Sequence, residues 1–235
     1  MEPVVLSHVS KTYHLDAVDV PALLDVNLEI RPNCFTVISG PSGSGKSTLL
    51  NMIGCIDQPD QGDVYIAGEA VRKLSDDALS DFRARHIGFI FQNFNLLPVL
   101  TVLENVEYPM LLSRVPSAER KRRATFLLEA VGLADRATNI PGQLSGGQRQ
   151  RVAIARALAP APSFVMADEP TANLDSQTGA AIIDLMRHMQ RERQVSFVFS
   201  SHDPKVLAAA DDAVKIRDGR IEKIERREER AKATA

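Results

Sequence analysis

The chain has 235 residues, of which 44% are hydrophobic and 25% charged, and its formal net charge is −2. This length suits one well-packed domain with a subdomain, and the composition is that of a soluble globular protein. No apolar run approaches the roughly 20 residues that a membrane-spanning helix needs, so a role at a membrane would depend on a partner.

The remaining composition narrows the function classes further. A near-neutral charge with 5% aromatic residues gives little support to nucleic-acid binding, and we expect none. Met1 to Val4 lack the positive and apolar regions of a signal peptide, and Cys34 and Cys55 have no metal-like spacing. We therefore expect a cytosolic protein with reduced thiols.

The first part of the chain alternates predicted strands with turns and helices. Strands are predicted at Val4–Val9, Leu24–Ile30, Cys34–Ser39 and Ile87–Phe91, and a turn with a short strand at Asp60–Gly68. Helices are predicted at Ser47–Ile53 and Asp76–Arg85, and a long link between the first two strands at His14–Pro21.

From Asn93 to about Gly142 the pattern becomes helical, which predicts a helical subdomain inserted between core strands. The later elements are helices at Val102–Met110, Pro116–Val131, Gln148–Ala159 and from Ser176, strands at Phe164–Ala167 and Val195–Ser200, and a tight turn at Asp218–Gly219. We assign residues 1–92 and 143–225 to a core with a β subdomain, 93–142 to the helical subdomain and 226–235 to a charged tail. This alternation predicts an α/β fold with a mostly parallel sheet.

A glycine-rich loop follows the predicted strand Cys34–Ser39. It reads Gly40-Pro41-Ser42-Gly43-Ser44-Gly45-Lys46-Ser47, which fits GxxxxGK[ST], and Thr48 continues into the helix. Glycines let backbone amides approach phosphate, the helix end adds positive potential, and Lys46 supplies a full charge to the β- and γ-phosphates. Ser47 offers a hydroxyl to Mg²⁺. The alternative, a glycine-rich turn with a chance lysine, does not explain the flanking strand and helix.

Two acids, Asp168 and Glu169, follow the apolar run Phe164–Ala167 and therefore come at the carboxyl end of a predicted buried strand. Ligands of open α/β sheets collect at this edge. We expect Asp168 to hold Mg²⁺ through water and Glu169 to polarise the attacking water. Paired acids also occur as helix caps, but a cap does not account for the apolar run before them.

The pentapeptide Leu144-Ser145-Gly146-Gly147-Gln148 gives the chain its family resemblance. Alone it would also suit a surface loop. With the glycine loop upstream and the two acids downstream, the chain resembles the nucleotide-binding subunits of ATP-binding-cassette (ABC) transporters, whose signature is this pentapeptide. The resemblance implies a P-loop NTPase fold with a RecA-like core, an N-terminal antiparallel β subdomain and an inserted helical subdomain.

The resemblance also implies roles that the residues alone leave open. Gln92 resembles the Q-loop glutamine that contacts Mg²⁺ or the lytic water, and His202 resembles the switch histidine at the γ-phosphate; a lone histidine there is otherwise a structural hydrogen-bonder. Tyr13 resembles the A-loop aromatic that stacks on adenine, with half-buried packing as the alternative. Asn173-Leu174-Asp175 resembles the D-loop, with Asp175 at a subunit interface.

Ser145, Gly146 and Gly147 precede a predicted helix that starts at Gln148, so they form a second anion-binding helix end. In the family this signature covers the γ-phosphate that the opposite subunit holds. The resemblance therefore implies an ATP-hydrolysing homodimer with two ATP molecules and Mg²⁺ between its subunits, in an isologous two-fold arrangement.

Three stretches, Leu49–Pro59, Arg85–Pro98 and Thr101–Val106, resemble the macrolide-exporter and lipoprotein-releasing ATPases of the MacB/LolD type. These proteins work peripherally on the inner face of the bacterial plasma membrane. Their partners are integral-membrane permease subunits, with or without a periplasmic adaptor. We expect this chain to energise export, lipoprotein release or mechanotransmission.

The resemblance places a groove for a permease helix around Phe94–Met110. Leu96, Leu97 and Leu100 either serve this docking as exposed side chains or pack inside the helical insertion.

Three other functions are alternatives to a transporter subunit. A soluble ABC ATPase without a permease generally has a coiled-coil insertion, zinc cysteines or two cassettes, and this chain has none of these. A P-loop kinase would lack the signature pentapeptide. A regulator that does not hydrolyse ATP would not need Glu169 and His202, which are both present.

Overall fold

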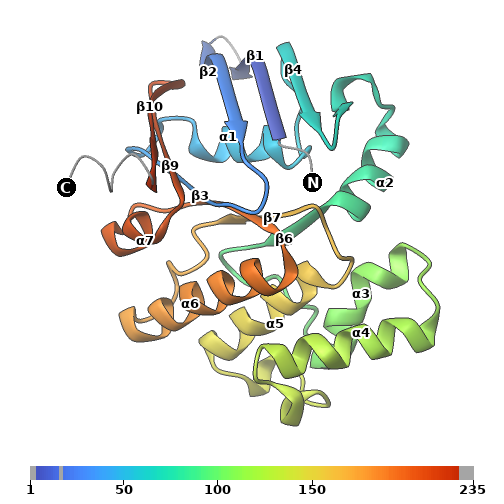
Figure 1. Cartoon of the computed structure of the whole chain (residues 1–235). Helices are drawn as coiled ribbons and strands as arrows, with labels where there is room; N and C mark the ends of the chain where they lie inside the picture. Colours follow the sequence, from blue (N-terminus) through green and yellow to red (C-terminus); the bar gives the residue numbers. More distant parts are fainter. Residues whose placement is uncertain (1–3, 16–17, 228–235) are drawn as a thin grey trace. The chain divides into compact units, whose positions relative to one another are not determined.

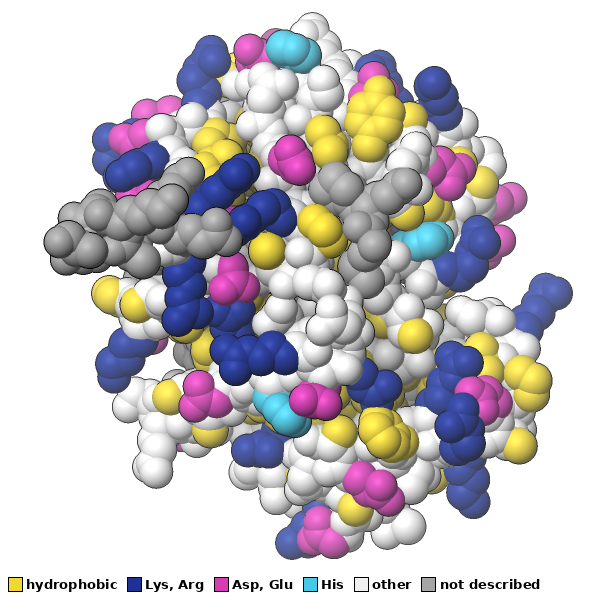
Figure 2. Space-filling model, in the orientation of Figure 1, with side chains coloured by type: hydrophobic (Ala, Val, Ile, Leu, Met, Phe, Trp, Pro, Cys, Tyr) yellow, Lys and Arg dark blue, Asp and Glu magenta, His cyan; other side chains and the backbone are white. Residues whose placement is uncertain are grey.

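A computed structural model describes residues 4–15 and 18–227 of the chain. It divides into two compact units, the first taking in Met1–Leu79 with Ser196–Ala235 and the second Ser80–Val195, and each is described by itself. Among the described helices, none is long and apolar enough to cross a bilayer. Basic and acidic side chains are interspersed over the face seen in Figure 2, which matches the small net charge.

The first unit holds most of the strands (Figure 1). Its elements are β1 Val4–Leu15, β2 Val18–Ile30, β3 Phe35–Ser39, α1 Lys46–Ile53, β4 Gln61–Ile66, β5 Glu69–Ala70, η1 Val71–Lys73, the start of α2 Asp76–His86, β8 Ser196–Ser200, α7 Pro204–Ala209, β9 Asp212–Arg217 and β10 Arg220–Arg226. An antiparallel sheet has the order β2-β1-β4-β5, and the other strands of the unit follow the order β10-β9-β3-β8.

The predicted link at His14–Pro21 is wrong for its described residues, because β1 extends to Leu15, β2 begins at Val18 and the two strands pair antiparallel. The pairs Tyr13↔Val20 and His14↔Asp19 extend the ladder, and the His14 imidazole lies 2.6 Å from the Asp19 carboxylate. Pro21 is accommodated because β2 is an edge strand, where a missing N–H leaves no ladder bond unmade. Asp16 lies outside the described residues.

The core of the first unit is built around β3, which lies parallel to both β8 and β9. Its residues from Phe35 to Ile38 are buried on both faces, as is typical of parallel strands with covered faces. The Phe35 ring lies 5.9 Å from Phe197 and 4.8 Å from Phe199 of β8, measured between centroids. Four apolar residues of α1 are buried as well, so β3 and α1 hold the connection between them from both ends.

The second unit is mainly helical. It contains the rest of α2, β6 Ile87–Ile90, α3 Val102–Leu112, α4 Ser117–Ala130, η2 Ala134–Arg136, η3 Pro141–Gln143, α5 Gly146–Leu158, β7 Phe164–Asp168 and α6 Ser176–Arg193. β6 and β7 pair in parallel, and α3 packs against both α4 and α5 (Figure 1). Thr101 and Glu104 form a capping box that fixes the start of α3. The buried Asn105 side chain ties the preceding loop to the helix by bonding to the backbone of Leu97.

Candidate functional site

The glycine loop of the first unit connects β3 to the N-terminus of α1. Gly45 is the residue before the helix and has φ 100°, a left-handed conformation that favours glycine. A Cβ there would lie 2.5 Å from the Ala22 carbonyl oxygen, and one on Gly40 would lie 2.1 Å from the carbonyl oxygen of Ile216. The turn between β9 and β10 braces the loop, because the Gly219 N–H donates to the Ser44 carbonyl at 3.1 Å. Close packing against β2 and against the β9–β10 hairpin therefore fixes the glycine loop.

The geometry of this loop fits a phosphate chain. The Lys46 ammonium donates to the carbonyls of Gly40 and Pro41 at 2.9 and 2.8 Å, which holds the charge over the loop and leaves a third N–H for an anion. Ser44 Oγ is buried without a hydrogen-bond partner, which is costly unless a ligand supplies one. Gly43 faces open space, and Ser47 is exposed at the start of α1. The loop thus offers N–H donors and the hydroxyls of Ser44 and Ser47 to an anion with a bound cation.

His202 lies at the same edge of the first unit as the glycine loop. Ile38 of β3 and Ser200 of β8 are partners in the parallel register, so the loop and His202 both follow two residues later. The Ser201 N–H donates to the Ile38 carbonyl at 3.1 Å and extends this pairing. His202 itself is exposed. The register of β3 and β8 therefore brings His202 and the glycine loop to the same edge of the sheet.

Tyr13 lies near the end of β1 in the first unit and is half-buried. Its hydroxyl donates to Asp57 Oδ2 at 3.1 Å, and the Lys11 ammonium lies 5.4 Å from the ring centroid. The ring is therefore held by named contacts on β1 and on the loop after α1. An aromatic ring in this state can offer a face to a planar ligand.

In the second unit, the parallel pair β6 and β7 brings Gln92 and the two acids to one edge. Ile90 pairs with Ala167, so Gln92, Asp168 and Glu169 follow within two residues of this pair. Asp168 and Gln92 are exposed, whereas the four residues of β7 before Asp168 are buried, as the sequence predicts. Glu169 has φ 43°, a strained backbone of the kind that clusters at active sites.

The pentapeptide Leu144–Gln148 begins α5. Leu144 is buried, and Ser145 is the N-cap: its Oγ accepts from the Gln148 N–H at 3.3 Å while Gln148 Oε1 accepts from the Ser145 N–H at 2.9 Å. This capping box gives Gln148 a structural role and fixes the helix end. The helix start also carries the partial positive charge of the aligned peptide dipoles, which favours a bound anion.

Several loops converge on this helix start. A Cβ on Gly147 would lie 2.5 Å from Thr178 Cγ2, and one on Gly146 would lie 3.3 Å from Leu174 Cδ2. The Asp175 carboxylate caps α6 by accepting from the N–H of Thr178 at 3.0 Å. Hydrogen bonds from the Thr178 side chain and from its N–H lower the pKa of Asp175. The second unit therefore gathers the pentapeptide and the 173–175 turn at one place.

The residues of the 4–15 and 18–227 ranges contain no group of three or more His, Cys, Asp or Glu side chains arranged to hold a metal. The candidate donors are instead the Ser47 hydroxyl in the first unit, and the Gln92 amide and one carboxylate, Asp168, in the second. Such sparse oxygen donors suit Mg²⁺, which is commonly bound by one or two protein groups together with phosphate oxygens.

Comparison with known protein families identifies the family of this chain. Residues 23–172 match the family model described as ABC transporter, and this range includes both the glycine loop and the pentapeptide. The chain belongs to the ABC transporter ATP-binding family. It is the ATPase subunit of such a transporter, and its relatives assign it to the MacB/LolD type.

Individual relatives of this ABC protein agree with the family match. It is 53% identical over 222 residues to an uncharacterized ABC transporter ATP-binding protein of Thermotoga maritima, covering 94% of both chains. It is 44% identical to the macrolide export ATP-binding/permease protein MacB of Syntrophobacter fumaroxidans, over 94% of this chain and 31% of that protein.

A solved structure shares the fold. The ATP-binding cassette MJ0796, a protein of Methanocaldococcus jannaschii, is dimeric and bound to ADP and Pi in a post-hydrolysis state. Its TM-score to this ABC protein is 0.85 at 44% identity, over 95% of this chain and 98% of that one. The expected cassette fold is therefore confirmed.

The ABC protein contains two side chains, Arg156 and Gln150, whose polar contacts could not be predicted from the sequence. Arg156 of α5 donates to the carbonyl of Phe94 at 2.7 Å and to that of Asn95, and both acceptors have left-handed backbones, with φ 63° and 47°. The Gln150 side chain, on the same helix, donates to the Pro170 carbonyl at 2.6 Å. The sequence places Arg156 and Gln150 on the helix after the signature. It does not indicate their hydrogen-bond partners, because these lie 20 or more residues away along the chain.

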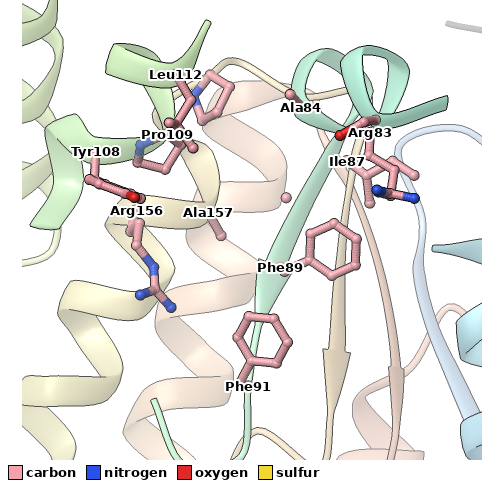
Figure 3. A pocket seen from close by; sticks show the side chains of 13 residues that line it. Arg83, Ala84, Ile87, Phe89, Phe91, Tyr108, Pro109, Leu112, Arg156 and Ala157 are labelled. Carbon is pink, nitrogen blue, oxygen red and sulfur yellow. The ribbon is translucent and has the colours of Figure 1, made fainter. Parts of the chain in front are cut away.

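A pocket of about 330 Å³ lies in the second unit of the ABC protein (Figure 3). Phe89 and Phe91 reach it from β6 and the residue after it, Tyr108 and Leu112 from α3, and Arg156 from α5. Its exposed apolar groups include Leu112, which is 64% exposed.

The three leucines expected to dock a permease do not line this pocket. Leu96, Leu97 and Leu100 are half-buried, and the carbonyls of Leu97 and Leu100 accept hydrogen bonds from the Asn105 side chain. This arrangement favours the alternative that they pack within the helical insertion.

Proposed function

We propose that two copies of this chain bind two ATP molecules with Mg²⁺ between them, head to tail, and that hydrolysis drives the dimer apart. The observation that carries the proposal is the presence of two anion-binding helix starts on one chain. One is the start of α1 with Lys46, and the other is the start of α5 with its exposed N-cap Ser145. The dimeric state of MJ0796 with ADP and Pi supports the same arrangement.

The proposed reaction is phosphoryl transfer to water, which depends mainly on positioning and charge stabilisation. The glycine loop from Gly40 to Thr48 binds the β- and γ-phosphates. Ser47, Gln92 and Asp168 would hold Mg²⁺, which would neutralise phosphate charge when bound. Glu169 orients and deprotonates the attacking water. His202 contacts the γ-phosphate.

The adenine base stacks on Tyr13, and the other subunit contributes the signature. Ser145 to Gln148 of one copy would approach the γ-phosphate bound by its partner, with Asp175 at the same interface. Binding energy that differs between the closed and open dimer is what couples ATP turnover to a change of state.

A complementation experiment tests the composite site. Lys46→Ala disables the glycine loop and Ser145→Arg disables the signature, so each homodimer is expected to be inactive. Random exchange of subunits makes half of the dimers mixed, and each mixed dimer has one intact site out of two. The mixture should therefore recover about a quarter of wild-type ATPase activity.

The controls for this experiment are thermal melting and nucleotide binding of each variant. Ser145→Arg has an intact glycine loop and should still bind ATP. If both variants are folded and the mixture stays inactive, or if Ser145→Arg alone is fully active, the site is not shared between subunits.

We further propose that the pocket of the second unit receives a short helix of an integral-membrane permease, on the inner face of a bacterial plasma membrane. The support is that MacB is an ATP-binding/permease protein in which this chain matches only 31% of the length. The pocket walls are largely apolar, with Phe91 and Tyr108 39% and 38% exposed, as partner sites often are. We also propose a periplasmic adaptor as a further partner of this assembly.

Two neighbouring leucines offer a matched test of docking. Leu112 lines the pocket and is 64% exposed, whereas Leu111 is 50% exposed on the same helix and is not among the lining residues. Leu112→Asp should abolish co-purification with the permease subunit, and Leu111→Asp should leave it intact. Equal effects of the two substitutions on co-purification would refute this docking site.

A further inference from the structure

The loop that follows α1, residues 54–60, is bound to β1 by several hydrogen bonds. The Asp60 N–H donates to the Ser10 carbonyl at 2.9 Å, and Asp60 Oδ2 accepts from the Thr12 N–H at 2.7 Å. The Lys11 ammonium donates to Asp57 Oδ1 and to the Gln58 carbonyl, both at 2.9 Å. These hydrogen bonds therefore hold the loop in a fixed position relative to β1.

The same loop is also fastened to α1. The N–H groups of Ile56 and Asp57 both reach the Asn51 carbonyl, at 2.9 and 3.3 Å. Asp57 is thus joined through one rigid helix to Lys46, the first residue of α1. Eight helical residues span about 12 Å, so the carboxylate has a fixed distance from the glycine loop.

Tyr13 is the third member of this cluster. Lys11 and Tyr13 are two residues apart on β1, so their side chains point to the same face of the strand. The tyrosine hydroxyl donates to Asp57 Oδ2 at 3.1 Å while the ammonium of Lys11 lies over the ring. One carboxylate therefore bonds both to the ring's polar end and to the cation on the ring's face.

We infer that Lys11 and Asp57 are positioning residues for nucleotide binding, which hold the Tyr13 ring at a fixed place relative to the glycine loop so that a purine stacks on the face away from Lys11. The inference rests on the proposed function, in which Tyr13 stacks on the base. It adds that the base site and the phosphate site are connected through α1 and its C-terminal loop.

The charge states of the pair support this arrangement. Burial alone would raise the pKa of Asp57, but hydrogen bonds from Lys11, the Gln58 N–H and Tyr13 lower it overall. Burial would lower the pKa of Lys11, but the contacts with Asp57 and Asp60 raise it overall. Both groups are therefore charged around neutral pH, and a charged acceptor makes the bond from the tyrosine hydroxyl stronger than a neutral one would.

The test measures binding of ATP and of inorganic tripolyphosphate, a probe without a base, by calorimetry on the full chain. Asp57→Asn and Tyr13→Phe should each weaken ATP binding about three- to tenfold, which is part of the stacking contribution, and leave tripolyphosphate unchanged. Tyr13→Phe removes the donor of the bond that Asp57→Asn weakens, so the double variant should bind ATP no more weakly than Asp57→Asn alone. Asp25→Asn is the matched control, since Asp25 is in the same unit and pairs with His8 instead of Lys11 or Tyr13.

The outcomes separate this inference from the proposed function. Additive losses, unchanged ATP binding in both single variants, or an equal loss of tripolyphosphate binding would overturn the positioning role. If Asp57→Asn does not fold, Tyr13→Phe and Lys11→Met with the two probes decide the same question. If Tyr13→Ala weakens ATP binding while Asp57→Asn does not, stacking stands and positioning fails. If Tyr13→Ala binds ATP normally, the proposed stacking itself is wrong, and the positioning role is overturned with it.

Discussion

Arg156→Ala should loosen the segment that follows Gln92 in the second unit. The guanidinium donates two hydrogen bonds, to the carbonyls of Phe94 and Asn95. Bonds that involve a charged group contribute about 1.5–3 kcal/mol each. The two acceptor residues have left-handed backbones, which cost roughly 1–2 kcal/mol per non-glycine residue. The arginine therefore offsets a strain of similar size.

The burial of Arg156 reduces this gain, since desolvation lowers its pKa. We expect a net loss of about 2–4 kcal/mol in the free energy that keeps the turn closed. Hydrogen exchange followed by mass spectrometry should then show faster exchange of the amides of residues 93–97. The kcat for ATP hydrolysis should fall as well, because Gln92 begins this segment.

Two variants control for the loss of an arginine. Arg149 lies on the same helix with its guanidinium 5.0 Å from the Phe94 ring centroid, a contact worth roughly 0.5–1 kcal/mol, so Arg149→Ala should change the exchange little. Arg156→Lys should recover only part of the protection, because a single ammonium lacks the fork that reaches two carbonyls. If Arg156→Ala leaves exchange at residues 93–97 unchanged while α5 remains protected, the reasoning is wrong.

Three further predictions concern catalysis, stability and pH. Glu169→Gln should bind ATP, hydrolyse it about 10²–10⁴-fold more slowly and accumulate as a dimer on gel filtration; normal turnover would contradict the assignment. Asp212→Ala should lower the free energy of unfolding by about 3–5 kcal/mol in urea titrations, since the carboxylate is 4% exposed and bonds to Arg31 at 2.6 and 2.9 Å; an unchanged urea midpoint would contradict this. Hydrogen bonds from Arg122 and Arg123 lower the pKa of Glu119 from 4.5 to about 2. The stabilisation from the charged Glu119 carboxylate is therefore fully present above pH 4.5 and is lost as the pH falls toward 2. The difference in urea midpoint between wild type and Glu119→Gln should shrink over that range, and a constant difference would contradict the pairing.

The sequence predicted most features that depend on local patterns. The buried run before Asp168, the strand before Gly40 and the turn at Asp218–Gly219 all have short-range signals, and the structure contains each of them. The start of α5 was predicted at Gln148, two residues late, because glycines at 146 and 147 are poor helix formers and only the cap at Ser145 reveals the true start.

The features that were missed depend on distant partners. The continuation of β1 to Leu15 is stabilised by pairing with β2 and not by apolar alternation, so the acidic stretch resembled a loop. The bond from Arg156 to Phe94 joins residues 62 apart, and the bond from Tyr13 to Asp57 joins residues 44 apart. Neither pair can be found from a single sequence, because nothing near either residue specifies its partner.

The turn at Gly219 has a consequence for biosynthesis. Its N–H bonds to Ser44 and its carbonyl accepts from the Leu24 N–H at 2.8 Å, so it fastens the glycine loop to β2. Gly219 is translated long after both of its partners. A ribosome-bound chain that stops before this residue thus has every residue of the glycine loop but not the turn that holds it. We expect nascent chains to acquire ATP affinity only after the turn at Gly219 has been synthesised.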